Sequence, residues 1–524
     1  MADEIENGTV PELRLFGRDK IYTSATRITR ENVIDEINRA LSLHMVNVSE
    51  IDYLYWYRRG VQPIINRTKE IRPEICNRIC VNNADTVVTF KNGYFLTSPV
   101  SYVSRKEDDA TAAEVKKLNE FLYTSGKQTA DNKVCDWFHT VGVGVIFCDP
   151  TKDDEEAKIR PMTVYALDPR SAFVVYSLRP GNKPMYGVNL VIDEKTIYVD
   201  VITEEKVFHL KGMPTPEKTT PRPDPLTAVY EIVSVEPNII GRVTIIEYVY
   251  KSTRMGAFEN SLSTMDAINT AESNRLDAVE QTVQNLMVMY NCELPEGETA
   301  NTIRESGLIV LTSTSDNRAD VKLMSESLDQ TQTQTTLDDL YEQMLEKCGV
   351  PSSVRDGGST SDNVGAVYLR SGWAMADTDA RNTEDLYRES NRLFDDVFLR
   401  VLKRRGLISK ELDVSDFDVT FIRNSLNNLL VKTQAALNMK TLGFAPELAF
   451  AKSGLSNDPI SDVEASRKYI DQMWVSPTQF MQGNRKNNPD GTNGADNDQD
   501  NVNGGGNSDG NGENNSSQSN VNAV

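Results

Sequence analysis

The most informative stretch of this chain is polar: Ser352-Ser-Val-Arg-Asp-Gly-Gly-Ser-Thr-Ser-Asp-Asn363. Its adjacent glycines and its lack of apolar periodicity predict a flexible loop. A helical pattern follows over 364–404, with Asp362 as the candidate N-cap and Gly406 as the end. Such a helix would span roughly 60 Å at 1.5 Å per residue. A helix of that length is typical of one that bridges the layers of an elongated molecule or lines an assembly.

The long helix carries a wide apolar face. This face consists of Trp373, Ala376, Ala380, Leu386, Leu393, Phe394, Val397, Phe398 and Val401. Packing against the same chain and packing against a second copy are both open. We expect both, because the face is wider than one neighbouring element covers. The same helix carries Asp395-Asp396, and the segment before the loop carries Asp338-Asp339. We interpret both acidic pairs as solvated helix faces.

The segments before the loop predict a helix, a compact β insert and a second helix. The first helix begins near Asn260, and the second begins near Thr335 and ends at Gly349 and Pro351. The β insert between them consists of three short runs, at 286–290, 308–311 and 321–324.

The first 250 residues or so predict mixed helix and sheet. Apolar spacing indicates one helix from Ile34 to Leu41 and another around Val115 to Leu122. Short β-branched and aromatic runs then follow, as in an antiparallel meander. These runs are 143–148, 163–167, 173–176, 186–192, 196–202 and 229–235. Five prolines within 211–227 predict an extended loop.

Composition limits the possible functions. The chain has 524 residues and a formal net charge of −21, which argues against gripping nucleic acid over a broad basic face. It does not exclude a protein that surrounds DNA without holding it. We expect neither a signal peptide nor a membrane span. After Lys486 the chain lacks lysine and arginine and is rich in Asn, Gly, Asp and Ser, which predicts disorder to Val524.

No catalytic or metal-binding pattern is complete. The sequence lacks a phosphate-binding Gly-x-x-x-x-Gly-Lys-Ser/Thr motif, and Gly142-Val-Gly144 predicts the entry to a strand instead. None of the three histidines completes a catalytic triad. Cys76, Cys80, Cys135 and His139 could supply four zinc ligands, but buried free thiols are favoured. We therefore predict a protein without enzymatic activity, cofactor or metal.

Several motifs, taken in order, resemble the portal proteins of tailed bacteriophages, in the group typified by Bacillus siphophage portals. They occur between about residues 50 and 475. They are Asn77-Arg78; Lys91-Asn-Gly-Tyr94-Phe-Leu96-Thr-Ser98-Pro99-Val100; Leu167-Asp-Pro-Arg170 before Phe173-Val-Val-Tyr176; Gly241-Arg-Val243-Thr-Ile-Ile246; the block 261–285 with Asp266, Asn269, Ser273 and Asp277; and Phe421-x-Arg423-Asn424 with Gly443 and Glu464.

The resemblance implies an α+β portal fold whose parts have names in the family. They are a mixed α/β wing (1–255), a first stem helix (256–285), a small α/β clip (286–330), a second stem helix (331–350), a tunnel loop (351–363), a long wing helix (364–405), a helical crown (406–480) and an acidic, Asn/Gly-rich disordered tail (481–524). In the tunnel loop the implied DNA-channel residues are Ser352, Ser353, Arg355, Gly357, Gly358, Ser359, Thr360 and Asn363. Without the resemblance, an ordinary surface linker is the favoured interpretation of this loop.

The resemblance further implies a homo-oligomeric ring of twelve subunits at one capsid vertex. Such a ring is the conduit for DNA packaging and ejection. It docks the terminase large subunit and then the head-completion and head–tail connector proteins, and it contacts the major capsid and scaffold proteins. The implied location is the virion, preceded by the host cytoplasm during assembly. The alternative is an intracellular assembly or scaffold protein unrelated to DNA and without catalytic activity.

Overall fold

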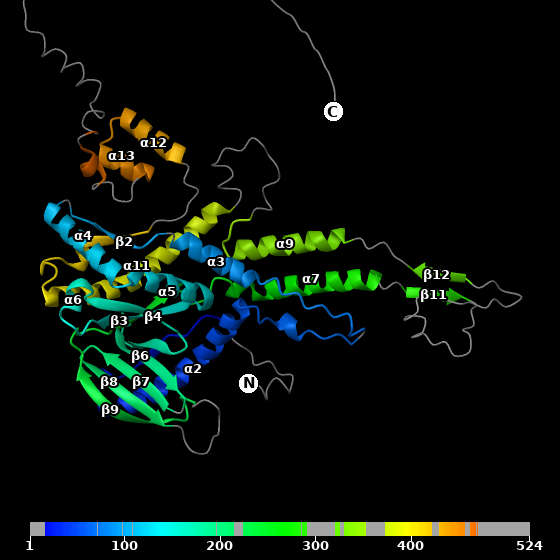
Figure 1. The fold of residues 1–524 in the computed structure, drawn as a ribbon, viewed down its shortest axis with the longest axis horizontal. Helices are drawn as coiled ribbons and strands as arrows, with labels where there is room; N and C mark the ends of the chain where they lie inside the picture. Colours follow the sequence, from blue (N-terminus) through cyan, green and yellow to red (C-terminus); the bar gives the residue numbers. More distant parts are fainter. Residues whose placement is uncertain are drawn as a thin grey trace, which may run out of the picture. The chain divides into compact units, whose positions relative to one another are not determined.

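The computed structural model describes residues 16–70, 72–96, 98–106, 108–194, 196–213, 224–283, 286–290, 320–324, 330–352, 372–421, 429–455, 462–467 and 469. The chain divides into two compact units, residues 1–428 and 429–524. Figure 1 shows helices and sheets mixed throughout the first unit, which confirms the predicted α+β class.

The predicted meander is present as the largest sheet described in the first unit. Its strands follow the order β1-β5-β6-β7-β8-β9, antiparallel from β5 to β9, with β1 parallel to β5. They are β1 (Ile21–Thr23), β5 (Ala172–Ser177), β6 (Pro184–Asp193), β7 (Thr196–Thr203), β8 (Lys206–Met213) and β9 (Val229–Pro237). The proline-rich loop was placed too early, because residues 211–213 belong to β8; residues 214–223 lie outside the described part.

The runs at 143–148 and 163–167 form a second sheet rather than a continuation of the first. This sheet has the order β10-β3-β4, with β3 (Val143–Pro150), β4 (Met162–Leu167) and β10 (Ile245–Val249). Gly142 ends the preceding helix α5 (Lys127–Val141) with φ 87°, so the glycine-containing sequence is a strand entry, as predicted.

Side-chain alternation on β5 explains how the two sheets stack. Phe173 and Val175 pack toward helix α2 (Val33–Arg58), while Ala172 and Val174 pack against Val145 and Ile245 of the second sheet. Successive strand side chains point to opposite faces, so a run of four apolar residues serves two layers at once. The sheets approach each other closely at Gly187 of β6, where a Cβ would lie 2.5 Å from Ile245 Cβ.

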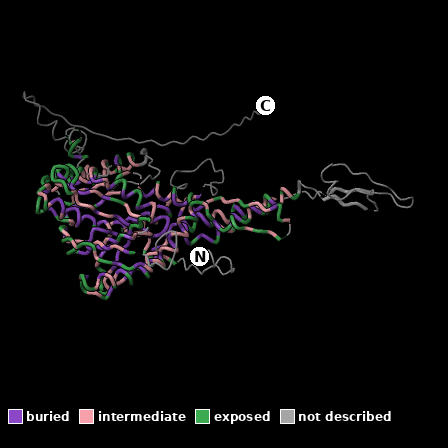
Figure 2. Tube along the Cα trace, turned by 60° about the horizontal axis from the view of Figure 1, so that its bottom comes forward, coloured by how far each residue is buried: buried purple, intermediate pink, exposed green. Residues whose placement is uncertain are grey.

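Four helices and a two-stranded sheet complete the main core. The helices are α3 (Asn83–Phe95), α4 (Asp109–Thr124), α5 and α11 (Trp373–Arg405), and β2 (Ser101–Ser104) pairs with β13 (Phe417–Thr420). Short helices or turns are η1 (Pro63–Asn66), α6 (Glu156–Ile159), η2 (Glu259–Ser261) and η3 (Val414–Asp416). Buried positions gather in the interior of the unit, as Figure 2 shows, and exposed positions lie on its outer elements.

The predicted order of helix, β insert and helix is present. Helix α7 (Leu262–Val283) and helix α9 (Thr331–Lys347) run antiparallel, and between them in sequence lies the hairpin β11 (Leu286–Tyr290) with β12 (Asp320–Met324). Arg275 of α7 donates from Nε to Gln330 Oε1 at 2.7 Å, next to the start of α9. The run predicted at 308–311 lies outside the described residues.

The long helix ends at Gly406, as predicted, with φ 69°. The structure describes it from Trp373; residues 364–371 and the proposed cap Asp362 lie outside the described part. Most of its apolar face is core, while Leu393 remains 44 % exposed. The solvated-face interpretation was wrong for Asp395, which is buried and accepts a hydrogen bond from Tyr102.

The second unit, considered by itself, is helical where it is described. Helix α12 (Leu429–Thr441) packs with helix α13 (Pro446–Ser453), and Lys432 Nζ donates to Gly454 O at 2.8 Å. The predicted disordered tail lies outside the described residues. Of the helices described here, none is long and apolar enough to cross a lipid bilayer.

Candidate functional site

The structure describes the base of the predicted channel loop, that is, the residues on either side of it, up to Ser352 and from Gly372 onward. Of the predicted loop residues, only Ser352 is described, and it is buried; Ser353, Arg355, Gly357, Gly358, Ser359, Thr360 and Asn363 lie outside the described residues. A Cβ placed on Gly372 would lie 3.7 Å from Pro351 Cα. The last described residues before position 353 and the first after position 371 therefore lie side by side.

A lysine from a distant helix holds the two sides of this base together. Lys91 of α3 donates from Nζ to Gly349 O at 3.0 Å, just after α9, and to Asp379 Oδ2 at 2.6 Å, on α11. Tyr250 also donates a hydrogen bond to Asp379 Oδ2, and Lys251 Nζ lies 3.5 Å from Oδ1. We call Lys91, Tyr250, Lys251, Gly349 and Asp379 the loop clamp.

The loop clamp stays charged although it is largely buried. Burial by itself would raise the pKa of Asp379, but Lys91 and Lys251 outweigh that effect and hold it below its usual range. Burial lowers the pKa of Lys91, and Asp379 opposes that change. The side chain of Lys91 is 6 % exposed, so losing Asp379 would leave a buried ammonium with less compensation.

Aromatic packing supports the same base from the α11 side. Trp373, the first residue of α11, lies 6.0 Å from Phe90 and 5.9 Å from Tyr94, measured between ring centroids. Both partners belong to α3, the helix that also carries Lys91. One face of α3 therefore fixes the ends of both helices that flank the loop.

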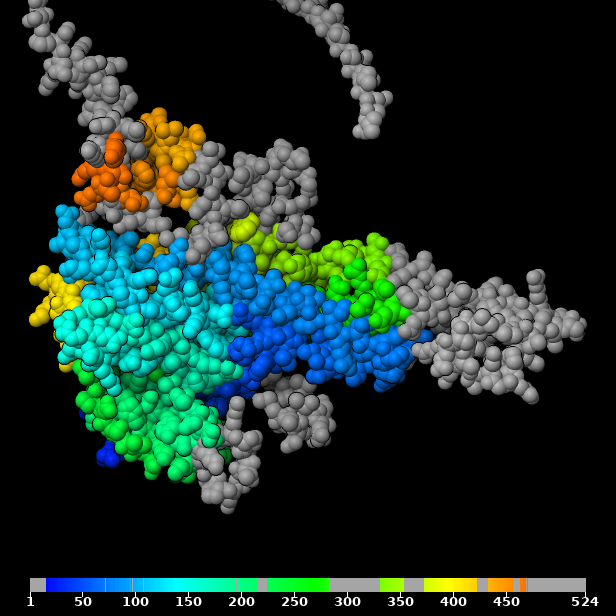
Figure 3. All heavy atoms as spheres, viewed as in Figure 1, coloured from blue at the N-terminus to red at the C-terminus, as the bar shows by residue number. Residues whose placement is uncertain are grey.

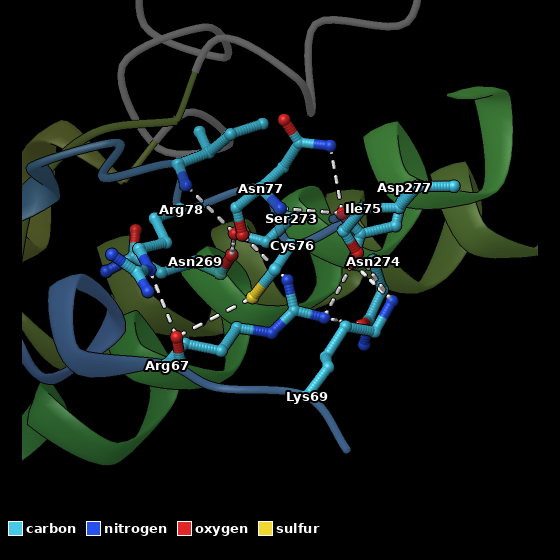
Figure 4. A network of polar contacts seen from close by, with 11 residues as sticks. Arg67, Lys69, Ile75, Cys76, Asn77, Arg78, Asn269, Ser273, Asn274 and Asp277 are labelled. Atoms are coloured by element: carbon cyan, nitrogen blue, oxygen red, sulfur yellow. Dashed lines mark hydrogen bonds and ion pairs between the residues drawn. The ribbon is translucent and has the colours of Figure 1, made fainter. Parts of the chain in front are cut away.

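A second feature attaches α7 to the body of the first unit. Three backbone amides donate to side chains on one stripe of α7: Asn77 N to Asp277 Oδ1 at 2.7 Å, Ile79 N to Ser273 Oγ at 3.0 Å, and Val81 N to Asn269 Oδ1 at 2.9 Å. Figure 4 shows Asn77 beside Asp277, with Ser273 and Asn269 further along the same helix, and Figure 3 shows residues in blue lying against α7 in green. We call this row the polar ladder.

The polar ladder forms because the spacing of alternate amides in an extended segment nearly matches the spacing of every fourth residue in a helix. Every second amide of an extended segment recurs after roughly 6.6 Å. Every fourth residue of a helix recurs after about 6.0 Å on nearly the same face. Side chains at 269, 273 and 277 therefore take the place of a neighbouring strand for residues 77–81. Amides that would otherwise lack a partner are satisfied without a sheet.

Asp277 is the most heavily used acceptor of the ladder. Besides the Asn77 amide, it accepts from Asn77 Nδ2 at 2.9 Å and lies 2.7 Å from Lys69 Nζ and 2.9 Å from Arg67 Nη2. Its side chain is 3 % exposed. Burial alone would raise the pKa of Asp277, but the hydrogen bonds from Lys69, Asn77 and Arg67 hold it well below its usual range.

The stripe on α7 continues toward the start of the helix. Tyr57 donates its hydroxyl hydrogen to Asp266 Oδ1 at 2.9 Å, and Asn269 Nδ2 donates to Gln62 Oε1. Burial, reinforced by Asp266, raises the pKa of Tyr57 well above its usual value. The tyrosine therefore remains a hydrogen-bond donor.

The structure brings together motifs that are far apart in sequence. Asn77 meets Asp277, and Lys91 meets the ends of the loop. In the described part of the chain, no group of three or more His, Cys, Asp and Glu side chains is placed to hold a metal ion. The sequence did not predict the partners of Lys91, because Gly349 and Asp379 lie far from it in the chain and share no local pattern with it.

The polar ladder, α7, α9 and the loop clamp all lie within the region matched by one protein-family model. The model is described as phage portal protein, SPP1 Gp6-like, and it matches residues 39–472. The chain belongs to this family. Among curated proteins, none matches the sequence significantly.

The resemblance inferred from the motifs is thereby confirmed. This portal protein is a virion protein of a bacteriophage capsid with a part in packaging the viral genome, and its family is structural in character. The match begins within α2 and ends beyond α13, so it includes nearly all of the described chain.

Proposed function

We propose that copies of this portal protein close into a ring at one capsid vertex and conduct double-stranded DNA during packaging and ejection. The observation that carries the proposal is the antiparallel α7/α9 pair, with the two ends of one loop clamped beside the end of α9. Within a ring, such an arrangement places one loop from each subunit at the same level along the ring axis. α7 also exposes Leu276 and Val279, 39 % each, which a neighbouring subunit would cover.

The parts of the fold then take the roles expected for the family. α7 and α9 are the stem, the hairpin β11–β12 belongs to the clip, and residues 351–363 are the tunnel loop. Residues 1–255 and α11 form the wing. The crown is assigned to 406–480, of which residues 429 onward form the separately compact part.

The clip would dock the terminase large subunit during packaging and connector proteins afterwards. The wing would contact the major capsid and scaffold proteins. The ring is expected to contain twelve subunits and to assemble in the host cytoplasm. A net charge of −21 per subunit favours a channel that repels phosphate, because strong basic contacts would hold the DNA in place.

Bulky residues at Gly357 and Gly358 should severely reduce the DNA packaged per particle. Phenylalanine at both positions would fill space around the DNA and restrict backbone conformations that glycine allows. Packaged DNA is measured by nuclease protection in procapsids that carry the variant portal.

The matched control makes the same double change at Gly504 and Gly505, in the C-terminal tail. It should package as the unmodified chain does. Ring formation by both variants must be checked first. Unchanged packaging by the Gly357/Gly358 variant in intact rings would refute the role of the loop.

The alternative is an assembly protein that does not handle DNA. It predicts discrete monomers or filaments of the purified chain under the electron microscope. The portal proposal predicts rings with a central hole.

A further inference from the structure

A pocket on the first unit gathers three arginines in a chain that is otherwise acidic. Its volume is about 280 Å³, and it lies among α11, η3, β13 and the end of β2. Arg105, Arg388 and Arg392 line it, together with Asp395 and Asp418. Neither the polar ladder nor the loop clamp contributes a residue to it.

Within the described part of the chain, the side chains of two of the three arginines have no polar partner. Arg105 and Arg392 are exposed, and neither guanidinium has a hydrogen bond or ion pair with another described residue. Their contribution to the fold is therefore small. Both remain available to a ligand that enters the pocket.

The third arginine is paired through a terminal nitrogen, because Arg388 Nη1 donates to Asp385 Oδ1, but it keeps one donor without a partner. Arg388 Nε is buried without a hydrogen-bond partner among the described residues. Its nearest carboxylate oxygens are those of Asp385 at 3.3 Å, Glu384 at 3.9 Å and Asp418 at 3.9 Å. The guanidinium lies over the Phe421 ring, 5.2 Å from its centroid, which fixes its position. A buried donor without a partner favours an added acceptor.

The two acids that line the pocket, Asp395 and Asp418, offset the arginine charge only in part. Asp395 lies at the buried end, where it accepts hydrogen bonds from Tyr102 Oη and from Asn391 Nδ2, the latter at 3.0 Å. Burial raises the pKa of Asp395 to about 7, so a substantial fraction is uncharged near neutral pH. The side chain of Asp418 is half exposed to solvent.

We propose that this arginine pocket binds an oxyanion of the phosphate type. Guanidinium groups form paired, charge-assisted hydrogen bonds with tetrahedral oxyanions, and three converging groups can contact several oxygens at once. The volume accommodates one such group with water. The chemistry is the same for free phosphate and for a phosphodiester of DNA.

Isothermal titration of the full-length chain with sodium sulfate and with inorganic phosphate tests the proposal. Chloride replaces the oxyanion at constant ionic strength, so that general screening is held fixed. Arg392→Gln and Arg105→Gln should each weaken binding about tenfold. Arg381→Gln is the matched control, since Arg381 lies on the same helix outside the pocket and is 69 % exposed. It should change binding by less than about twofold.

A second arm uses a short DNA duplex as competitor. Displacement of sulfate by the duplex, lost in Arg392→Gln, identifies a DNA phosphodiester as the ligand. If sulfate and phosphate bind but the duplex does not displace them, the ligand is free phosphate. The proposal is overturned if neither ion binds, or if the Arg392 and Arg105 variants bind as the parent does.

Discussion

Replacing Asp379 by alanine should lower the free energy of unfolding of the subunit by about 4 kcal/mol, the cost of breaking a buried ion pair. The change removes the main partner of Lys91, whose ammonium is buried, and the acceptor of the Tyr250 hydroxyl. The loss is measured as a shift of the urea midpoint at fixed protein concentration.

Two variants sharpen this prediction. Asp377→Ala, two residues away on α11, removes a contact to the exposed Arg381 and should cost less than about 1 kcal/mol. Adding Lys91→Met to Asp379→Ala should recover part of the lost stability, because the uncompensated buried charge is gone. A loss no larger than that of Asp377→Ala would contradict the loop clamp.

Replacing Asp277 by alanine should cost about 3 kcal/mol, because Arg67 and Lys69 lose their shared carboxylate and the Asn77 amide loses its acceptor. The local signature is hydrogen exchange. The amides of Asn77, Ile79 and Val81 should exchange faster in the variant, with the largest change at Asn77. Uniformly faster exchange through the first unit would point to general destabilisation instead.

The contribution of Asp277 to the free energy of unfolding should also decrease as the pH falls. Its pKa is lowered in the folded chain, so its stabilisation is present above the unfolded value of about 4 and is lost as the pH falls through the folded pKa. The difference in stability between the parent chain and Asp277→Asn should therefore be full at pH 6 and shrink below about pH 4. A difference in stability that grows as the pH falls would contradict a charged Asp277 in the polar ladder.

Local patterns predicted many elements of the fold, although α3, α5 and β1 were not among them. The strands of the meander, the helix pair around the β insert and the end of α11 at Gly406 all follow from periodicity and turn residues. The partition of the strands into two sheets could not be predicted in this way. It depends on β10 pairing with β3 across about a hundred residues, and nothing local in Ile245–Val249 specifies that partner.

The candidate site was predicted in part. The stripe of Asp266, Asn269, Ser273 and Asp277 was identified in the sequence, yet its role as a set of acceptors for extended backbone was not. A polar stripe on a helix ordinarily indicates a solvated face. Asp395 shows the same difficulty: an acid beside another acid is usually exposed, but here Tyr102 and Asn391 supply hydrogen bonds that make burial possible.

Imaging the purified full-length chain by cryo-electron microscopy tests the ring most directly. The account predicts closed, rotationally symmetric particles with an axial opening that admits a DNA duplex and with α7 and α9 beside it. Particles that are monomeric, or closed assemblies whose axis is blocked by folded protein, would contradict it.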